Sequence, residues 1–159
     1  MAKKTGKDKS PRIVNRRARH DYHIMETLEV GLALLGSEVK SVRDGQVSLA
    51  EGYARIEPAD MQLYLYEVDI ARYVHSGPDG HETKRRRKLL AHSRQIKQLL
   101  ALTTDKGTTL IPLTMYFVRG RVKLELAVAR GKRSYDKRDT MKQRESDREI
   151  RKAMTRKRI

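Results

Sequence analysis

The chain has 159 residues, a formal net charge of +16 and no cysteine. Disulfides and thiolate metal sites are therefore excluded, and the length fits one domain with extensions. No apolar run approaches the roughly 18 residues that a membrane span needs, and no apolar stretch follows the basic start as in a secretory signal. We expect a cytoplasmic protein without a membrane partner.

The positive charge lies at the two ends of the chain. Residues 1–19 carry a net charge of +7, residues 20–129 carry +1 and residues 130–159 carry +8. A nearly neutral body between two cationic arms favours nucleic acid as the partner. Residues 1–14 mix Lys, Gly, Ser and Pro, and we expect them to form a disordered basic arm.

The first half of the body predicts three strands and a short helix. The first strand covers residues 22–35, where Gly31 suggests a bulge or sharp bend. Residues 36–45 predict a helix with Ser37 as its N-cap. Two strands, 47–56 and 61–70, then flank a turn-rich connection.

The second half of the body predicts one helix and a hairpin. The leucine spacing predicts a helix from Leu89 through about Leu102. Strands 108–118 and 121–130 form a hairpin across Arg119–Gly120, and alternate residues of the second strand are apolar. About six strands and two short helices predict a mainly β domain over residues 15–130, a small six-stranded antiparallel OB-like barrel.

Residues 131–159 form a basic C-terminal tail with few apolar residues. Such a segment cannot bury enough apolar surface to offset the entropy of ordering itself. Residues 141–158 nevertheless lack Pro and Gly, and Asp147 and Arg151 stand four apart, as do Ile150 and Met154. We expect the tail to be disordered when free and helical against RNA.

Several residues are candidates for RNA contact, each with a plainer alternative. The cluster Asn15–Arg19 enters the first strand and could hold phosphates, or it is a solvated arm. Glu29 could accept hydrogen bonds from a base or a 2′-OH, or it is simply solvated. The run Lys84–Lys88 precedes two leucines that suit an unstacked base, or it is a solvated loop. Tyr64 and Tyr66 could form a stacking platform, but core packing is favoured.

Catalytic and metal-binding patterns are missing from the sequence. His20 and His23 lie three apart on an expected strand and point to opposite faces. There is no Ser/His/Asp set, and Gly131–Lys132 lacks the rest of a P-loop. We therefore expect no enzyme activity, no cofactor and no metal.

Five ordered blocks of the sequence stand out: Asn15–Tyr22, Glu29–Gly31, Gly36–Arg43, Arg87–Leu90 and Gly131–Arg138. Together they closely resemble the SsrA-binding protein family, also called small protein B. Tyr135 stands where some members have His, and Ala153 where a larger aliphatic residue can occur. Residues 74–84 also depart from the usual pattern.

The resemblance implies an OB-type barrel that grips the tRNA-like domain of transfer-messenger RNA in trans-translation. It also implies that the tail enters the decoding centre and the empty mRNA channel of a stalled small ribosomal subunit. The elongation factor that carries aminoacyl-tRNA would be an indirect partner. Two rivals remain: a structural ribosomal protein, which composition suits equally, and an RNA-processing enzyme.

The expected contacts fall into two groups. Asn15, Glu29 and Leu90 enter the first group by resemblance. For RNA binding we expect Asn15, Arg16, Arg17, Arg19, His20, Glu29, Lys40, Arg43, Arg87, Lys88 and Leu90. For the ribosome we expect Gly131, Lys132, Arg133, Tyr135, Asp136, Lys137, Arg138, Arg144, Arg148, Arg151 and Met154.

Overall fold

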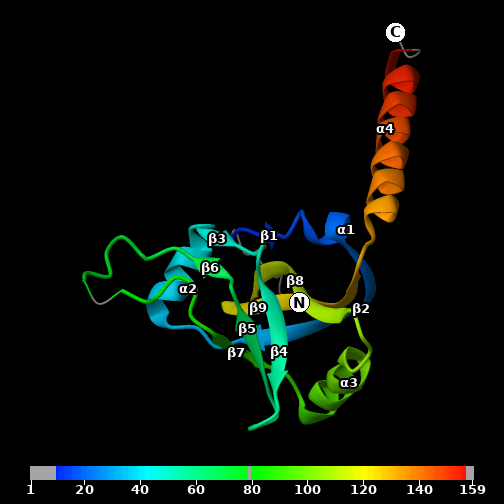
Figure 1. Cartoon of the computed structure of the whole chain (residues 1–159). Coiled ribbons are helices and arrows are strands. Elements are labelled where there is room, and N and C mark those ends of the chain that lie inside the picture. Colours follow the sequence, from blue (N-terminus) through cyan, green and yellow to red (C-terminus); the bar gives the residue numbers. More distant parts are fainter. Residues whose placement is uncertain (1–9, 79, 157–159) are drawn as a thin grey trace, which may run out of the picture.

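Six antiparallel strands close into a ring in this computed structural model, which describes residues 10–78 and 80–156 (Figure 1). The ring runs β8-β4-β5-β7-β2-β9, and β9 pairs again with β8. The OB-like barrel that the sequence predicts is therefore confirmed. Its strands are β2 (Tyr22–Leu32), β4 (Tyr53–Glu57), β5 (Gln62–Tyr66), β7 (Arg87–Leu90), β8 (Thr108–Val118) and β9 (Arg121–Gly131).

The other strands and the helices lie outside the ring. Strand β1 pairs with β8 at Thr114 and Met115, and β3 pairs with β6 in a separate two-stranded sheet. Helix α4 projects away from the barrel as a separate rod (Figure 1). The elements are β1 (Ile13–Val14), β3 (Val47–Ser48), β6 (Asp69–Ile70), α1 (Ala18–Asp21), α2 (Gly36–Arg43), α3 (Ser93–Thr103) and α4 (Ser134–Arg156).

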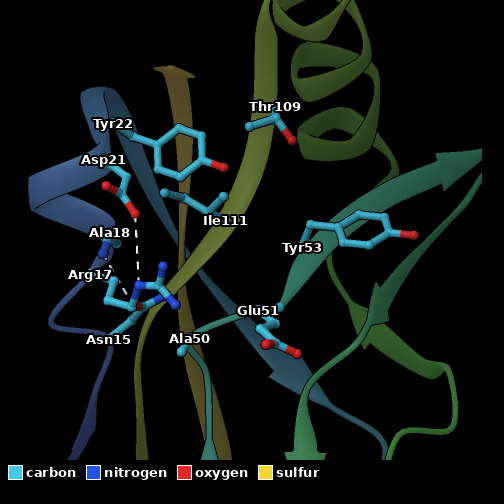
Figure 2. Close-up of a pocket in the computed structure, with 11 residues that line it drawn as sticks. Asn15, Arg17, Ala18, Asp21, Tyr22, Ala50, Glu51, Tyr53, Thr109 and Ile111 are labelled. Carbon is cyan, nitrogen blue, oxygen red and sulfur yellow. Dashed lines mark hydrogen bonds and ion pairs between the residues drawn. The ribbon is translucent and has the colours of Figure 1, made fainter. Parts of the chain in front are cut away.

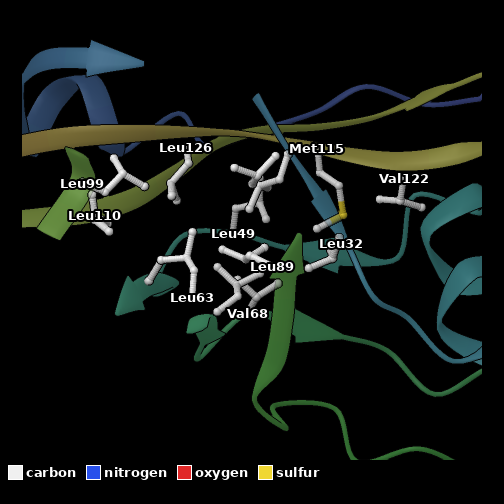
Figure 3. Packing of buried hydrophobic residues seen from close by; sticks show 14 of the residues in the cluster. Leu32, Leu49, Leu63, Val68, Leu89, Leu99, Leu110, Met115, Val122 and Leu126 are labelled. Atoms are coloured by element: carbon white, nitrogen blue, oxygen red, sulfur yellow. The ribbon is translucent and has the colours of Figure 1, made fainter. Parts of the chain in front are cut away.

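Alternation along the strands fills the barrel with apolar side chains (Figure 3). On β9, Val122, Leu124 and Leu126 point inward, as the sequence predicts. Leu63 and Leu89 meet them from the opposite wall. A second, smaller cluster lies under α1, where Ala18 packs with residues of β8 and β9. The barrel is thus covered on its outer side where α1 sits.

The helix expected to begin at Leu89 starts four residues later. Leu89 belongs to β7, where it pairs with Leu63 of β5 and Leu32 of β2 and is buried. Helix α3 begins at Ser93. A short apolar run suits both a buried strand and a helix, and here the closure of the ring decides for the strand.

Two local features of the first half differ from expectation. The register shift of β2 lies between Ile24 and Glu26, and not at Gly31. Gly31 instead lies directly against Leu90. A Cβ at this glycine would lie 3.1 Å from the Leu90 Cβ, so a side chain here would crowd Leu90. The N-cap of α2 is Leu35 and not Ser37, whose hydroxyl is hydrogen-bonded to His81 instead.

Both ends of the chain contain more secondary structure than the sequence predicts. Residues 13–14 of the expected arm form β1 because Ile13 packs against the core, while residues 1–9 lie outside the described part. The tail is helical from Ser134, ahead of the expected residue 141. Loss of this helix in the free protein remains a prediction. No helix among the described residues is long and apolar enough to cross a membrane.

Candidate nucleic-acid interface

Three of the expected RNA-binding residues line one groove of about 520 Å³. Glu29 comes from β2, and Lys88 and Leu90 come from β7. The two strands are paired through Gly31 and Leu90, which places the carboxylate, the ammonium group and the isobutyl group on one outer surface. Lys123 of β9 adds a second cation to the same groove.

Glu29 is held in place by two neighbours. The hydroxyl of Tyr116 donates a hydrogen bond to Oε2 of Glu29, and Nζ of Lys123 lies 3.6 Å from Oε1. Burial, and then the bond to this carboxylate, raise the pKa of Tyr116 to about 12, so the phenol stays a donor. Glu29 is therefore a fixed acceptor at the rim of the groove.

Leu90 supplies an exposed apolar surface beside these charges. Its side chain is 52% exposed although it belongs to a barrel strand. The absence of a side chain at Gly31 gives it room. An apolar contact flanked by Lys88 and a fixed carboxylate offers both phosphate attraction and a surface for an unpaired base.

Arg87 is wrongly predicted as an RNA contact. It is 1% exposed and points into the barrel, where its Nε lies 2.8 Å from Oε1 of Glu38. Its other donors bind the carbonyl oxygens of Val68 and Thr83. The strand alternation Arg87-Lys88-Leu89-Leu90 turns one cation inward and the next outward, so only Lys88 can reach a phosphate.

Glu38 completes this buried cluster. Its Oε2 also accepts a hydrogen bond of 2.6 Å from Nη2 of Arg85, and the backbone N–H of Leu35 donates to the same oxygen. Burial raises the pKa of Glu38, but the hydrogen bonds from Arg85, Leu35 and Arg87 outweigh burial and hold it below its usual value. The cluster joins α2 to the end of β7.

Asn15 acts inside the protein. Its Nδ2 donates to the carbonyl oxygens of Leu49 and Pro112, each at 3.0 Å, and its Oδ1 accepts from the N–H of Ala18. The side chain is buried. Asn15 is therefore a positioning residue that fixes the start of α1 to the barrel, and its amide is unavailable for RNA.

The arginines around α1 remain free to contact RNA. Arg16, Arg17 and Arg19 are exposed. Arg17 overhangs a pocket of about 260 Å³ between α1 and β4, in which its Nε lies 3.9 Å from the Asp21 carboxylate (Figure 2). His20 is half-buried, and its Nδ1 lies 2.9 Å from Oδ1 of Asp21.

Helix α2 presents two further expected cations on the surface. Lys40 lies 5.0 Å from the ring centre of Tyr73, and Arg43 lies 5.5 Å from that of Phe117. Both side chains are exposed. Each cation is held against an aromatic face, which reduces the side-chain freedom that binding would remove.

The tail leaves the barrel through contacts with α1. The N–H of Lys132 donates to the carbonyl oxygen of Asp21 at 2.9 Å, and its Nζ donates to that of Arg19. Nζ of Lys137 lies 3.2 Å from Oδ1 of Asp21. A hydrogen bond from His20, opposed by burial and aided by Lys137, holds the pKa of Asp21 below its usual value. Asp21 thus fixes the root of the tail.

From residue 141 on, the described part of the tail is open to solvent. Asp136 lies 3.7 Å from Nε2 of His23, and a Cβ at Gly131 would meet nothing within 4 Å. The side chain of Tyr135 lies outside the described part. Met154 is 68% exposed. The expected ribosome contacts Arg133, Arg138, Arg144, Arg148 and Arg151 are all exposed.

Sequence reasoning missed the residues that hold this surface together. Tyr116 and Lys123 alternate with buried residues of the predicted hairpin, and this alternation was the available signal. The partnership of Glu38 with Arg85 and Arg87 joins positions far apart in sequence and leaves no local trace. The described residues contain no group of three or more metal-binding side chains.

A small closed β barrel with exposed arginines beside α1, lysines around an outer groove and a projecting basic helix is typical of a nucleic-acid-binding protein of the OB type. The chain belongs to the SmpB family, because the family model described as "SmpB protein" matches residues 12–156. Its relatives carry a name that denotes binding and not catalysis: SsrA-binding protein. We therefore interpret the arginines near the two ends and the groove residues as groups for binding and not for catalysis.

Three similar proteins support this membership. The SsrA-binding protein of Thermobifida fusca is 47% identical over 99% of this chain and 100% of its own length. That of Levilactobacillus brevis is 46% identical over 97% of this chain and 98% of its own length. A chain of a solved structure described as "tmRNA-SmpB: a journey to the center of the bacterial ribosome" is 45% identical, with a TM-score of 0.66. The match covers 79% of the present chain and 87% of the chain in the solved structure.

Proposed function

We propose that the protein is an RNA-binding adaptor of trans-translation that carries transfer-messenger RNA to stalled ribosomes. The names of its relatives and of the similar solved complex support this RNA and the ribosome as partners. The barrel, residues 15–130, would bind the tRNA-like domain. The tail, residues 131–159, would act on the ribosome.

The groove between β2 and β7 is the proposed site for the tRNA-like domain. Glu29 would accept hydrogen bonds from a base edge or a 2′-OH, and Leu90 would support an unpaired base. Lys88, together with Arg16, Arg17 and Arg19, His20, Lys40 and Arg43, would contact phosphates. This division assigns specificity to the fixed acceptor and affinity to the cations.

Helix α4 is the proposed probe of the decoding centre and of the empty mRNA channel. Arg144, Arg148 and Arg151 are spaced by four and three residues, so they lie along one side of the helix. A vacant channel is a groove lined with phosphates, and mRNA would compete with the helix for it. Gly131, Lys132, Arg133, Tyr135, Asp136, Lys137, Arg138 and Met154 belong to the same proposed contact set.

The observation that carries this proposal is the separation of two cationic surfaces on one chain. The groove lies on the barrel wall, whereas α4 stands away from the barrel on a root held by Asp21 (Figure 1). RNA capture and ribosome probing can then occur together. The elongation factor that carries aminoacyl-tRNA would join through the RNA.

Deletion of residues 131–159 tests the division. We expect the affinity for an isolated tRNA-like domain transcript to stay within about twofold while peptide tagging on stalled ribosomes is lost. The matched control is Glu29→Ala in the full chain. It should lower the affinity for the transcript by about tenfold, because it removes one hydrogen-bond acceptor from the interface. Equal loss of affinity in both variants would contradict the proposal.

A further inference from the structure

The outer face of β4 and β5, together with Arg86 and Lys88 at β7, carries three tyrosines and three cations, of which the proposed function uses only Lys88. We call the set Tyr53, Arg55, Tyr64, Tyr66, Arg86 and Lys88 the tyrosine face, although Lys88 also borders the groove. Alternation places Leu63 and Leu65 inside the barrel, so Tyr64 and Tyr66 point outward. The expectation that these two tyrosines pack in the core is wrong.

The strand register brings these side chains together. Tyr53 pairs with Tyr66, Arg55 pairs with Tyr64, and Tyr64 pairs with Lys88. The rings of Tyr53 and Tyr66 are stacked, with centroids 5.4 Å apart and planes inclined by 15°. Arg86 lies over the ring of Tyr64 at 4.9 Å. Aromatic faces and cations therefore alternate across three adjacent strands.

Two of the three tyrosine rings, Tyr64 and Tyr66, are held in fixed orientations by acidic neighbours. The hydroxyl of Tyr64 donates to Oδ2 of Asp60 at 2.7 Å, and that of Tyr66 donates to Oε1 of Glu57. These bonds raise the pKa of both tyrosines, which stay neutral. Ring faces fixed in this way lose little freedom when another flat group stacks on them.

Space for such a group exists next to Tyr53. Its side chain is 40% exposed and borders two hollows, of about 260 Å³ and 340 Å³, which Tyr66 does not line. Tyr53 stands at the margin of the first hollow in Figure 2, across from Arg17. The ring can thus continue its stack with Tyr66 on the side away from that partner.

We propose that the tyrosine face binds a single-stranded RNA segment. Bases would stack on Tyr53 and on the Tyr64–Arg86 pair, while Arg55 and Lys88 would contact phosphates. Base stacking on aromatic side chains beside a positive groove is the general way in which proteins hold unpaired RNA. The inference shares with the proposed function the premise that RNA is the partner and one cation, Lys88, whereas its tyrosines, Arg55 and Arg86 have no part in the proposed groove.

Fluorescence anisotropy with a labelled oligouridine of about 10 nucleotides tests the proposal. We expect Tyr53→Leu to weaken binding about fivefold or more, since it removes a stacking ring, and Tyr53→Phe to stay within about twofold. Arg86→Ala should weaken binding, whereas the charge-matched control Lys106→Ala on an exposed loop should not. The chain contains no tryptophan, so its emission comes from seven tyrosines, and the part of the quenching on binding that Tyr53→Leu removes reports stacking on Tyr53.

A second RNA separates this inference from the proposed function. The transcript of the tRNA-like domain should bind Tyr53→Leu as it binds the wild type, which also establishes that the variant is folded. If Tyr53→Leu does not fold, two measurements decide the question. They are the oligouridine affinity of Arg86→Ala and the tyrosine quenching of Tyr53→Phe compared with that of the wild type. Unchanged oligouridine affinity in the variants would overturn the inference and leave this face to a protein partner. Equal losses for both RNAs would also overturn it.

Discussion

Glu38 and Arg87 form an ion pair inside the barrel, with Nε 2.8 Å from Oε1 and both side chains withdrawn from solvent. Glu38 lies in α2 and Arg87 lies in β7, so the pair joins a helix outside the ring to a strand within it. The remaining donors of Arg87 bind carbonyl oxygens, among them that of Val68, which draws the chain before β7 against the barrel. A charged pair therefore fixes the strand that carries Lys88 and Leu90.

Removing one partner of this pair should strongly destabilise the fold. Arg87→Met leaves the carboxylate of Glu38 buried with only Arg85 opposite, and loss of one partner of a buried pair costs about 3–5 kcal/mol. We expect that loss in the free energy of unfolding measured by urea denaturation. Arg94→Met on the exposed surface of α3 is the control and should change it by less than about 0.5 kcal/mol. A similar effect of both substitutions would contradict the structural role of Arg87.

The same carboxylate should make stability depend on pH. Because the pKa of Glu38 is lower in the folded protein than in the unfolded chain, its stabilisation is fully present above about pH 4.5. This contribution is lost as the pH falls through the folded pKa. Thermal unfolding of the wild type should therefore lose stability below pH 4.5 more steeply than that of Glu38→Gln. Parallel pH profiles of the two proteins would refute the assignment.

Asn15 and Arg17 should separate a positioning role from a binding role. Asn15→Ala leaves the carbonyl oxygens of Leu49 and Pro112 without their donors, and each unmet buried group costs about 1–3 kcal/mol. We expect lower unfolding free energy together with weaker RNA binding. Arg17→Ala should weaken RNA binding and flatten its salt dependence while the unfolding free energy stays unchanged. Loss of RNA affinity in Asn15→Ala without loss of stability would place Asn15 in direct contact with RNA.

Substitution of Gly131 should affect the ribosome and not the fold. Packing does not require glycine here, since an added Cβ would meet no atom within 4 Å. We expect Gly131→Ala to keep its unfolding free energy within about 0.5 kcal/mol and its affinity for the tRNA-like transcript. Peptide tagging by the same variant should fall if Gly131 approaches ribosomal RNA closely. Wild-type tagging would remove Gly131 from the proposed contacts.

Asp21 should control the tail root without affecting RNA capture. Asp21→Asn removes the charge that holds Lys137, whereas the backbone contact with Lys132 remains. We expect reduced tagging at unchanged transcript affinity, both measured with purified components. Asp105→Asn in the loop after α3 is the matched control, because it removes a carboxylate from an exposed site away from α1. If tagging by Asp21→Asn equals that by Asp105→Asn, the contact has no functional role.

Helix formation in the tail should depend on the partner. If residues 131–159 are coil in the free protein, circular dichroism should gain helical signal when ribosomal RNA is added at low salt. The chain that lacks these residues should show no gain. Full helical signal in the free protein would instead favour a preformed rod, as drawn in Figure 1.

The parts of the fold that alternation defines were predictable from sequence. The hairpin of β8 and β9 has the expected bounds to within one residue, because alternate residues of β9 are apolar and Arg119–Gly120 marks the turn. Leu89 and Leu90 were misplaced, because four residues do not distinguish a strand from a helix. The inward turn of Arg87 depends on Glu38, almost fifty positions away, and on the closure of the ring. Spacing alone therefore suggested a run of five exposed cations over residues 84–88, whereas the structure buries Arg87 and leaves Lys88 on the outside.

Strand β9 continues directly into the root of α4, and it is paired along most of its length with both β2 and β8. A pull on the helix is thus transmitted along the strand axis, and the hydrogen bonds of two ladders bear the load in shear. Under such a load the hydrogen bonds of each ladder have to break together and not one by one. The barrel can therefore serve as a firm mechanical anchor when the helix is drawn into, or withdrawn from, a narrow passage.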